Sequence, residues 1–557
     1  MNDQDSWKNY FSSPGSSRSA GTLLAAFLFF VALAAWLQWA GGAYHSEFGE
    51  HADEPAHYMT GLMVRDYVAG GLPKSPVAYA KEYYQHYPKI GLGHWPPAFY
   101  VVQAAWMLPF PVSRTSVMVL QAVLAALLAT GLFAMARHVM PAALGLATGA
   151  VLLFDPLMQG LTREVMAEVL TATTIFFALW CYCRYLDSEH WRYAIGFGVL
   201  AGMALLTKGT AAMLIPVPLL CVLLTRRFRL LGQPWFWIPA LIAGALAGPW
   251  YLLAPGSMHE HALPGYVVAV NEVYVTRSVT RYFSLTGQGL APFLLLGLGV
   301  HVAARLVRRK PIEGIWAVAA AALLAMVIVR TVIPPARPVR HLLNVMPFWL
   351  LFAAAGLWWV MSLRPFERLA SHWRAAIAVM LLPGLFALDY RPLRKKDYGG
   401  FEAVAKEILA RPEWKDSVIL VSSDASGEGM LISEIAMRQR RPGHLVLRGT
   451  KVLSSSTWFG WNARTLFSSP KEIDEFLRGM PAGLVVFDGE PTRTPVHHEA
   501  LKLAIRASPE RWELVDKFPQ RRGQGDRRDG IYLYRLKGHE GRNPANVPNQ
   551  LRTADDS

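Results

Sequence analysis

The sequence predicts a polytopic α-helical membrane protein with a C-terminal soluble α/β domain. Hydrophobic residues make up 53% of the 557 residues, charged residues only 17%, and the mean hydropathy is +0.24. Apolar runs of roughly the 20 residues that a bilayer-spanning helix needs recur as far as residue 390. From Tyr398 onward, helix-like and strand-like stretches alternate instead, which is typical of an α/β domain.

Charge and cysteine usage agree with this class. A net charge of +15 also suits a nucleic-acid-binding protein, but many basic residues fall in short runs between apolar segments. That placement follows the positive-inside rule, so no nucleic-acid partner is predicted. Cys181, Cys183 and Cys221 lie within or beside apolar segments, so no disulfide framework is expected in the soluble part.

Eleven apolar segments are candidate spans, and the count rises to twelve or thirteen if further short segments cross. The polar residues 1–19 form a predicted N-terminal tail. The run after them is too long for a signal peptide and lacks a small-residue cleavage context, so it is expected to stay as an anchor. The candidate spans lie at 21–40, 115–136, 141–157, 165–186, 193–207, 210–225, 236–254, 289–307, 314–333, 341–361 and 375–388.

Three basic loops predict the orientation, because basic loops face the cytoplasm. The segments 41–113, 155–164, 208–209, 255–288 and 334–340 then face the other side, as does everything after residue 389. A cytoplasmic N-terminus follows only if the stretch 97–111 is a juxtamembrane or re-entrant helix that does not cross. The basic residues are Arg226, Arg227 and Arg229; Arg305, Arg308, Arg309 and Lys310; and Arg364, Arg368 and Arg374.

The predicted α/β domain occupies residues 391–540, and a disordered tail is expected at 541–557. Ser422 to Gly429 follows the first predicted strand, where an α/β sheet often binds an anion, although a solvated turn explains it as well. Helices are predicted at 400–410, 428–440, 471–479 and 498–507, and strands at 418–421, 445–447, 484–487 and 531–534.

The stretch His51 to Tyr58, just beyond the first span, places two adjacent carboxylates and a histidine where membrane meets water. Asp53 is predicted as the N-cap of a helix, with Pro55 in its first turn. One interpretation is simply a capped amphipathic helix at the interface. The other is a functional site.

Ionisable residues favour the functional interpretation, because many gather on the predicted non-cytoplasmic side. Glu168 and Lys208 are flanked by apolar residues, so they need partners or a polar cavity. Lys208 also fits a lysine that snorkels to the interface, and Arg337 to His341 fits an interfacial anchor. The full set is Asp53, Glu54, His57, Lys89, His94, Asp155, Arg163, Glu164, Glu168, Lys208, Arg337, Arg340 and His341.

Several of these residues stand in short motifs whose order resembles a known family. The motifs span about residues 20–390 and are similar to those of GT-C glycosyltransferases, in particular the bacterial protein mannosyltransferase and aminoarabinose transferase branch. They are Asp53-Glu54-x-x-His57-Tyr58, His94-Trp-Pro-Pro-Ala-Phe-Tyr100, Thr162-Arg-Glu164 with Glu168, Leu206-Thr-Lys-Gly209, and Arg340-His-Leu-Leu-Asn-Val-Met-Pro347.

The resemblance implies a GT-C-like catalytic domain over 20–390 in the bacterial inner membrane, with the tail 1–19 cytoplasmic and the loop 41–113 and the C-terminal domain periplasmic. It implies inverting transfer of a sugar from a polyprenyl-phosphate donor to a periplasmic lipid, glycan or protein. Asp53 is then the general base and Glu54 its support. Lys208, Arg337, Arg340, His341 and Lys89 are assigned to the donor phosphate, and His57, Tyr58, His94, Trp95, Asp155, Glu164 and Glu168 to acceptor or sugar.

The chemistry fits these residues. A polyprenyl phosphate leaves as a stable anion, so the site needs cations for the phosphate and one base for the acceptor hydroxyl. Aminoarabinose transferases have Glu-Lys before the double proline where this chain has His94-Trp95, so the metal and phosphate contacts of that loop stay open. No cofactor is required, although a divalent metal is possible; His86 and His94 match no strong zinc spacing.

Two other hypotheses remain. A transporter or flippase of a lipid-linked or anionic substrate also carries charges among its spans. The sequence shows no internal repeat, however, and its charges gather on one face rather than at the midplane. A membrane part that merely anchors a periplasmic binding domain leaves the Asp53-Glu54 motif unexplained.

Overall fold

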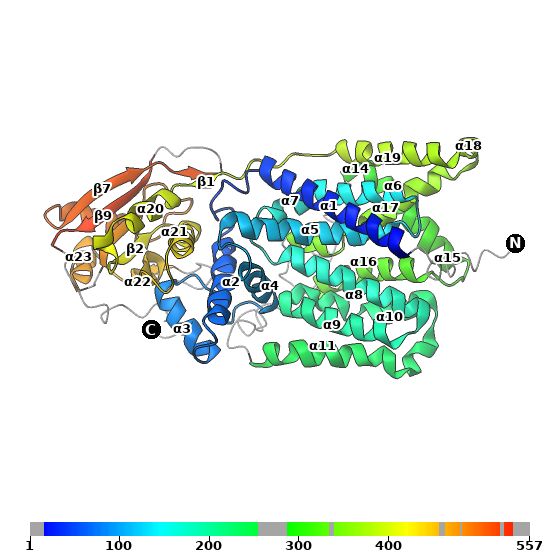
Figure 1. The fold of residues 1–557 in the computed structure, drawn as a ribbon, viewed down its shortest axis with the longest axis horizontal. Helices are drawn as coiled ribbons and strands as arrows, with labels where there is room; N and C mark the ends of the chain where they lie inside the picture. Colours follow the sequence, from blue (N-terminus) through cyan, green and yellow to red (C-terminus); the bar gives the residue numbers. More distant parts are fainter. Residues whose placement is uncertain are drawn as a thin grey trace.

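The chain folds into a long helical bundle with an α/β domain at one end (Figure 1). The computed structural model describes residues 16–253, 287–332, 339–455, 463–479, 482–523 and 529–538. The predictions for Arg337, for residues 1–15, for most of 255–288 and for the tail 541–557 therefore lie outside the described residues.

Each predicted span corresponds to apolar helix in the bundle. Within the described ranges, five helices are long and apolar enough to cross a membrane, and a sixth candidate is a pair bent by 63°. The bundle helices are α1 (Ser16–Ala40), α5 (Arg114–Ala136), α6 (Ala142–Phe154), α7 (Pro156–Thr162), α8 (Glu168–Ser188), α9 (Trp191–Thr207), α10 (Val217–Thr225), α11 (Pro234–Leu253), α14 (Gly287–Leu298), α15 (Ala304–Val307), α16 (Gly314–Val332), α17 (Met346–Met361), α18 (Arg364–Glu367) and α19 (Ser371–Ala387), with short 3₁₀ or π turns η2 (Gly209–Leu214), η3 (Phe228–Gly232), η5 (Gly299–Ala303) and η6 (Val339–Asn344).

Small residues let bundle helices approach closely, as expected where lipid removes the hydrophobic drive between helices. α14 and α17 meet at two glycines: a Cβ at Gly297 would lie 2.1 Å from the Phe352 carbonyl oxygen, and one at Gly356 would lie 2.0 Å from that of Phe293. The central helices α5, α8 and α17 are largely buried, whereas α1 and α11 expose most of their side chains at the rim. The bundle core therefore lies around α5, α8 and α17.

The loop between α1 and α5 contains three helices, α2 (Asp53–Ala69), α3 (Pro76–His86) and α4 (Ala98–Met107). α2 and α4 pack together between the bundle and the α/β domain (Figure 1). α4 has 10 residues, hence a length of about 15 Å, about half of a hydrocarbon core. This length suits a juxtamembrane or re-entrant helix, and the non-crossing of 97–111 stays a prediction.

The α/β domain is built on a five-stranded sheet of order β3-β2-β6-β9-β7. β2 is parallel to β3 and β6, whereas β9 is antiparallel to β6 and β7. The edge strand β7 was not predicted from the sequence. The elements are β1 (Tyr398–Gly399), α20 (Phe401–Ala410), η7 (Pro412–Trp414), β2 (Val418–Ser422), α21 (Ala425–Arg438), β3 (Val446–Arg448), α22 (Gly449–Val452), β4 (Ser454–Ser455), β5 (Arg464–Thr465), α23 (Pro470–Gly479), β6 (Ala482–Asp488), α24 (His498–Ala507), β7 (Trp512–Phe518), β8 (Arg521–Arg522) and β9 (Ile531–Leu536).

The turn after β2 is neither an open anion site nor a solvated turn, so both interpretations of Ser422 to Gly429 were wrong. Ser423 is fully buried, and the Asp424 carboxylate accepts from the backbone N–H groups of Ser426 and Gly427 at 3.0 and 2.9 Å. The Arg522 guanidinium lies 3.0 Å from Asp424. The chain's own carboxylate thus occupies the helix N-terminus where an external anion would bind.

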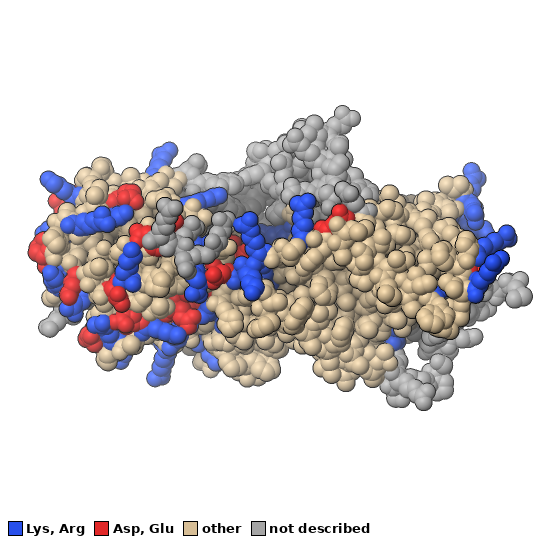
Figure 2. Space-filling model, turned by 90° about the horizontal axis from the view of Figure 1, so that it is seen from above, with Lys and Arg blue, Asp and Glu red and all other residues tan. Residues whose placement is uncertain are grey.

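Charge is concentrated at the two ends of the molecule (Figure 2). Basic and acidic side chains cover the α/β end and basic ones the opposite tip, and the bundle surface between them is largely uncharged in this view. α15 and α18, which carry Arg305 and Arg364, lie at the tip away from the α/β domain (Figure 1). The basic loops and the α/β domain thus lie at opposite ends of the bundle.

Candidate active site

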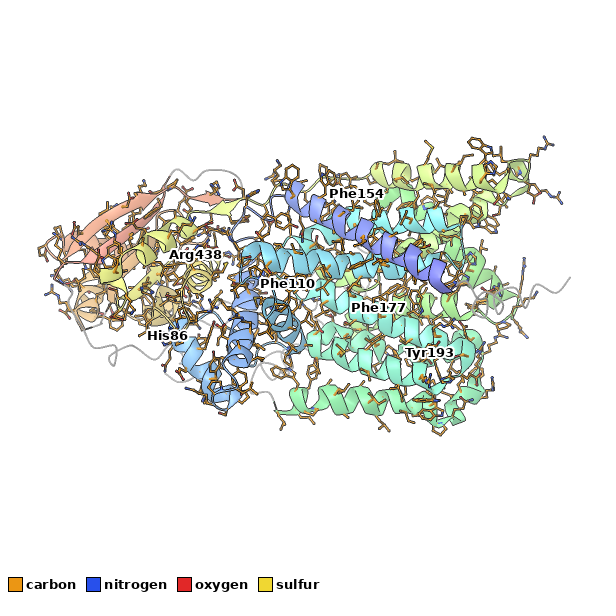
Figure 3. All side chains as sticks on the ribbon, viewed as in Figure 1. His86, Phe110, Phe154, Phe177, Tyr193 and Arg438 are labelled. Carbon is orange, nitrogen blue, oxygen red and sulfur yellow. The ribbon has the colours of Figure 1, made fainter. Side chains whose placement is uncertain are left out.

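The α/β domain docks on the first loop through polar contacts. Arg441 Nε lies 2.6 Å from Asp66 Oδ2 of α2, and the Tyr83 hydroxyl donates to the same oxygen at 3.1 Å. His86 Nδ1 lies 2.8 Å from the Gly443 carbonyl oxygen. In Figure 3, His86 on α3 lies beside the α/β domain. This junction fixes α2 and its neighbours between the two parts of the molecule.

α2 begins at Asp53, but the prediction that Asp53 caps it was wrong. Asp53 is the first helical residue, and the preceding Ala52 provides no side-chain cap. The imidazole of His51 takes that role, because its Nδ1 accepts from the Asp53 backbone N–H at 3.1 Å. The Asp53 carboxylate is therefore not used by the backbone, and its side chain stays 29% exposed.

Asp53 lies in an ionic cluster contributed by four separate segments. Arg340, in η6, places Nη2 3.9 Å from Asp53 Oδ2 and Nε 3.0 Å from Glu168 Oε1. Lys208, in the turn between α9 and η2, donates from Nζ to the same Glu168 oxygen at 2.6 Å. His51 Nδ1 lies 3.4 Å from Asp53 Oδ2. The structure thus brings together residues 53, 168, 208 and 340, as their predicted common side implied.

The two carboxylates of this cluster differ in access to solvent. Glu168 is only 2% exposed and serves both cations, so it acts as their anchor rather than as a sugar-contacting group. Arg340 and Lys208 keep 24% and 19% of their side chains exposed, comparable with Asp53. Burial lowers the pKa of His51, so its ring is neutral at pH 7. Of these two carboxylates Asp53 is therefore the accessible one; it lies 3.9 Å from Arg340, and Glu168 links Arg340 to Lys208.

An aromatic wall adjoins the cluster. The His57 ring packs on Trp95 with centroids 4.3 Å apart, and its Nδ1 lies 2.8 Å from the Tyr100 hydroxyl. Burial lowers the pKa of His57 to about 3, so this histidine is neutral and does not act as a cation. A Cβ at Gly91 would lie 2.7 Å from the Trp95 ring, which explains why glycine stands under it. His94 meets Trp95 edge-on at 4.8 Å.

Three predicted site residues have other roles in the structure. Tyr58 is fully buried against Phe48, with ring centroids 4.9 Å apart, so it cannot contact a sugar. Asp155 caps α7 through the backbone N–H groups of Leu157 and Met158, at 2.8 and 3.4 Å. Glu54 is fully buried in an ion pair with Lys396 and has no access to substrate. Asp155 and Glu54 are structural because the backbone and a buried cation use their carboxylates, and Tyr58 is structural because its ring is packed in the core.

Lys396 itself was missed by sequence analysis. It follows Arg394 and Lys395, and a basic run just after the last span looks like an ordinary solvated stretch. Its side chain is instead fully buried. Glu164 lies near this pair, and burial together with the Glu54 carboxylate raises the pKa of Glu164 to about 8.

Lys89 lies apart from Lys208 and Arg340, on the α/β side of the site. Its Nζ donates to the Ala425 carbonyl oxygen at 2.9 Å. Burial, and then the neighbouring Arg448, lower the pKa of Lys89 to about 7. His341 is buried beside the cluster, near enough for its charge to influence Glu168. Within the residues the structure describes, no three His, Cys, Asp or Glu side chains are grouped to hold a metal ion.

Comparison with known proteins identifies the fold of this chain. The profile of the family described as dolichyl-phosphate-mannose-protein mannosyltransferase matches residues 94–252. No curated protein matches the chain in sequence. Apo ArnT from Cupriavidus metallidurans superposes with a TM-score of 0.57 at 14% identity, covering 93% of this chain and 99% of ArnT.

Two further structures agree. ArnT from the same organism bound to undecaprenyl phosphate gives a TM-score of 0.54 at 13% identity, with 93% and 99% of the two chains covered. The Archaeoglobus fulgidus oligosaccharyltransferase complexed with Zn and sulfate gives 0.51 at 13% identity, with 83% of this chain and 68% of that one covered. The chain therefore has the fold of the GT-C membrane glycosyltransferases, as its motifs suggested.

Proposed function

We propose that this protein is an inverting membrane glycosyltransferase that moves a sugar from a polyprenyl-phosphate donor to a hydroxyl acceptor, with Asp53 as general base. One observation carries the proposal: an accessible carboxylate lies 3.9 Å from an accessible guanidinium, and a buried Glu168 holds that guanidinium and the Lys208 ammonium together. A base next to two cations meets the needs of a hydroxyl acceptor and a phosphate leaving group.

The reaction follows from these groups. The acceptor oxygen attacks the anomeric carbon while Asp53 takes the hydroxyl proton. The bond between that carbon and the phosphate oxygen breaks, and the electron pair leaves with the phosphate. Arg340 and Lys208 stabilise the charge that develops there, so no protein acid has to protonate the leaving group. Because attack and departure occur on opposite faces in one displacement, the configuration inverts.

The buried state of Glu168 argues against glycoside hydrolysis. A hydrolase of that kind needs a second carboxyl group that protonates the leaving oxygen. Glu168 is held by Lys208 at 2.6 Å and Arg340 at 3.0 Å, which keeps it charged and away from a substrate. Of the two carboxylates in the ionic cluster, Asp53 is then the one available to react, which suits transfer from a phosphate carrier.

The remaining predicted residues divide by position. Trp95 and His94 are proposed to contact the sugar or acceptor, and His57, which is only 3% exposed, is proposed to support the Trp95 ring. Lys89 approaches from the α/β side, where its charge and that of Asp53 interact. The proposed transfer does not require a divalent metal.

The membrane orientation is part of the same proposal. The site and the α/β domain lie at the end of the bundle opposite α15 and α18, whose arginines mark the cytoplasmic face (Figure 1). In the inner membrane of a bacterium, the site then faces the periplasm, where a polyprenyl-phosphate sugar is within reach. Undecaprenyl phosphate, the ligand of the similar ArnT structure, is the carrier we propose for this chain.

A deletion strain tests the function. Mass spectrometry of envelope lipids, glycans and proteins is expected to show one product lacking a sugar, with unglycosylated acceptor accumulating, and the wild-type gene is expected to restore it. Vesicles that contain the protein and a polyprenyl-phosphate sugar, but no acceptor, distinguish transfer from transport. Movement of the donor across such vesicles, with no missing glycan in the strain, would favour a flippase.

A further inference from the structure

We infer that Lys396 is a positioning residue for the transfer reaction. It lies in the linker between α19 and β1, and from there it fixes the spacing between Asp53 and Glu168, the carboxylate that anchors the two cations. The inference rests on the proposed function. Lys396 lies 342 residues from Glu54 in the sequence, and no motif marks it.

The Lys396 ammonium ties together two segments that deliver site residues. Its Nζ donates to Glu54 Oε1 in the first turn of α2 and to the Arg163 carbonyl oxygen at 3.0 Å. Both side chains of the ion pair are 0% exposed. A charge pair without access to water has a strong, fixed geometry, because either partner alone would be an uncompensated buried charge.

The same carboxylate oxygen binds the second segment directly. Glu54 Oε1 also accepts from the Val165 backbone N–H at 3.3 Å. Asp53 immediately precedes Glu54, and Glu168 follows Val165 by three residues at the start of α8. The contact of Lys396 with both segments therefore sets how far the base lies from the carboxylate that holds Arg340 and Lys208.

The backbone of Lys396 is itself held in place. Its N–H donates to the Gly41 carbonyl oxygen at 2.8 Å. Gly42 has φ +81°, and a Cβ there would lie 2.5 Å from the Lys396 carbonyl oxygen, so only glycine allows this approach. Two residues later, the Tyr398 N–H donates to Ser46 Oγ at 3.0 Å. The Lys396 ammonium thus projects from a backbone segment that is held in place by hydrogen bonds.

A double-mutant cycle tests the inference. In the transfer assay, K396M and E54Q are each expected to lower kcat by about 30-fold or more, because small displacements of reacting groups reduce rates strongly. The double variant E54Q/K396M is expected to show a similar loss and not the product of the two losses, since the residues act through each other. The donor dissociation constant is expected to change less than threefold in all three, because neither residue contacts the donor site.

The exposed neighbour Lys395 supplies the matched control, K395M, which is expected to behave as wild type. If K396M misfolds, the charge-neutral double variant decides. A kcat within threefold of wild type in whichever variant folds, or independent multiplying losses in the cycle, would overturn the positioning role. A wild-type protein without any transfer activity would instead contradict the proposed function, so the two failures are distinguishable.

Discussion

Replacing Glu168 by glutamine perturbs the centre of the ionic cluster with almost no change in volume. The wild-type carboxylate oxygen lies 2.6 Å from the Lys208 ammonium and 3.0 Å from Arg340 Nε. At an effective dielectric of about 20, the Lys208 and Arg340 contacts are worth roughly 6.4 and 5.5 kcal/mol of Coulomb attraction before desolvation is subtracted. Removing one partner from buried pairs costs about 3 to 5 kcal/mol, and both cations here are partly exposed, so we expect about 3 kcal/mol.

Two measurements follow for E168Q. Thermal unfolding in detergent is expected at a lower temperature than wild type, and kcat for transfer is expected to fall by about 100-fold or more. The rate falls because Arg340, freed from its anchor, is drawn to the Asp53 carboxylate 3.9 Å away and reduces its ability to take a proton. E413Q, at an exposed glutamate, is the control. Unchanged stability together with an unchanged rate in E168Q would refute the anchoring role.

Two further variants test neighbouring parts of the site. K208M is expected to weaken binding of a polyprenyl-phosphate sugar by about tenfold, because it removes one of the two cations proposed to bind the phosphate. Isothermal titration or competition measures this affinity, and an unaltered dissociation constant would contradict the assignment of Lys208. E164Q tests the pKa of Glu164, which the folded protein raises to about 8. Between pH 4.5 and 8 the Glu164 carboxyl group is protonated in the folded protein and ionised in the unfolded chain. The wild type is therefore expected to lose stability as the pH rises from 4.5 to 8, and E164Q to be less sensitive; a steeper pH dependence in E164Q would oppose this.

Much of the fold was predictable because a bilayer requires long apolar helices, which leave a strong hydropathy pattern in the sequence. Long apolar runs and basic loops identified the bundle helices, and alternating patterns identified most of the α/β domain. The edge strand β7 was missed because Glu513, Asp516 and Lys517 give it the composition of a solvated loop. An edge strand needs only one pairing neighbour, so its sequence carries a weak signal.

The candidate site was predictable only in part. The common location of Asp53, Lys208 and Arg340 followed from their predicted side of the membrane. The roles of Glu168 and Glu54 did not, because they depend on which cation each carboxylate meets, and those partners lie 40 and 342 residues away in the sequence. The capping role of His51 could not be predicted either, because aspartate is a far more common N-cap residue than histidine.

The Asp53→Asn variant tests the central claim most directly. Among the residues that the structure describes, the Asp53 carboxylate has only long side-chain contacts, 3.4 Å to His51 and 3.9 Å to Arg340, so the substitution is not expected to disturb folding. With D516N, at an exposed aspartate, as control, we expect the transfer rate of D53N to fall by about 100- to 10,000-fold, the range of a lost general base, while donor binding persists. A D53N enzyme that transfers sugar within tenfold of the wild-type rate would contradict the account.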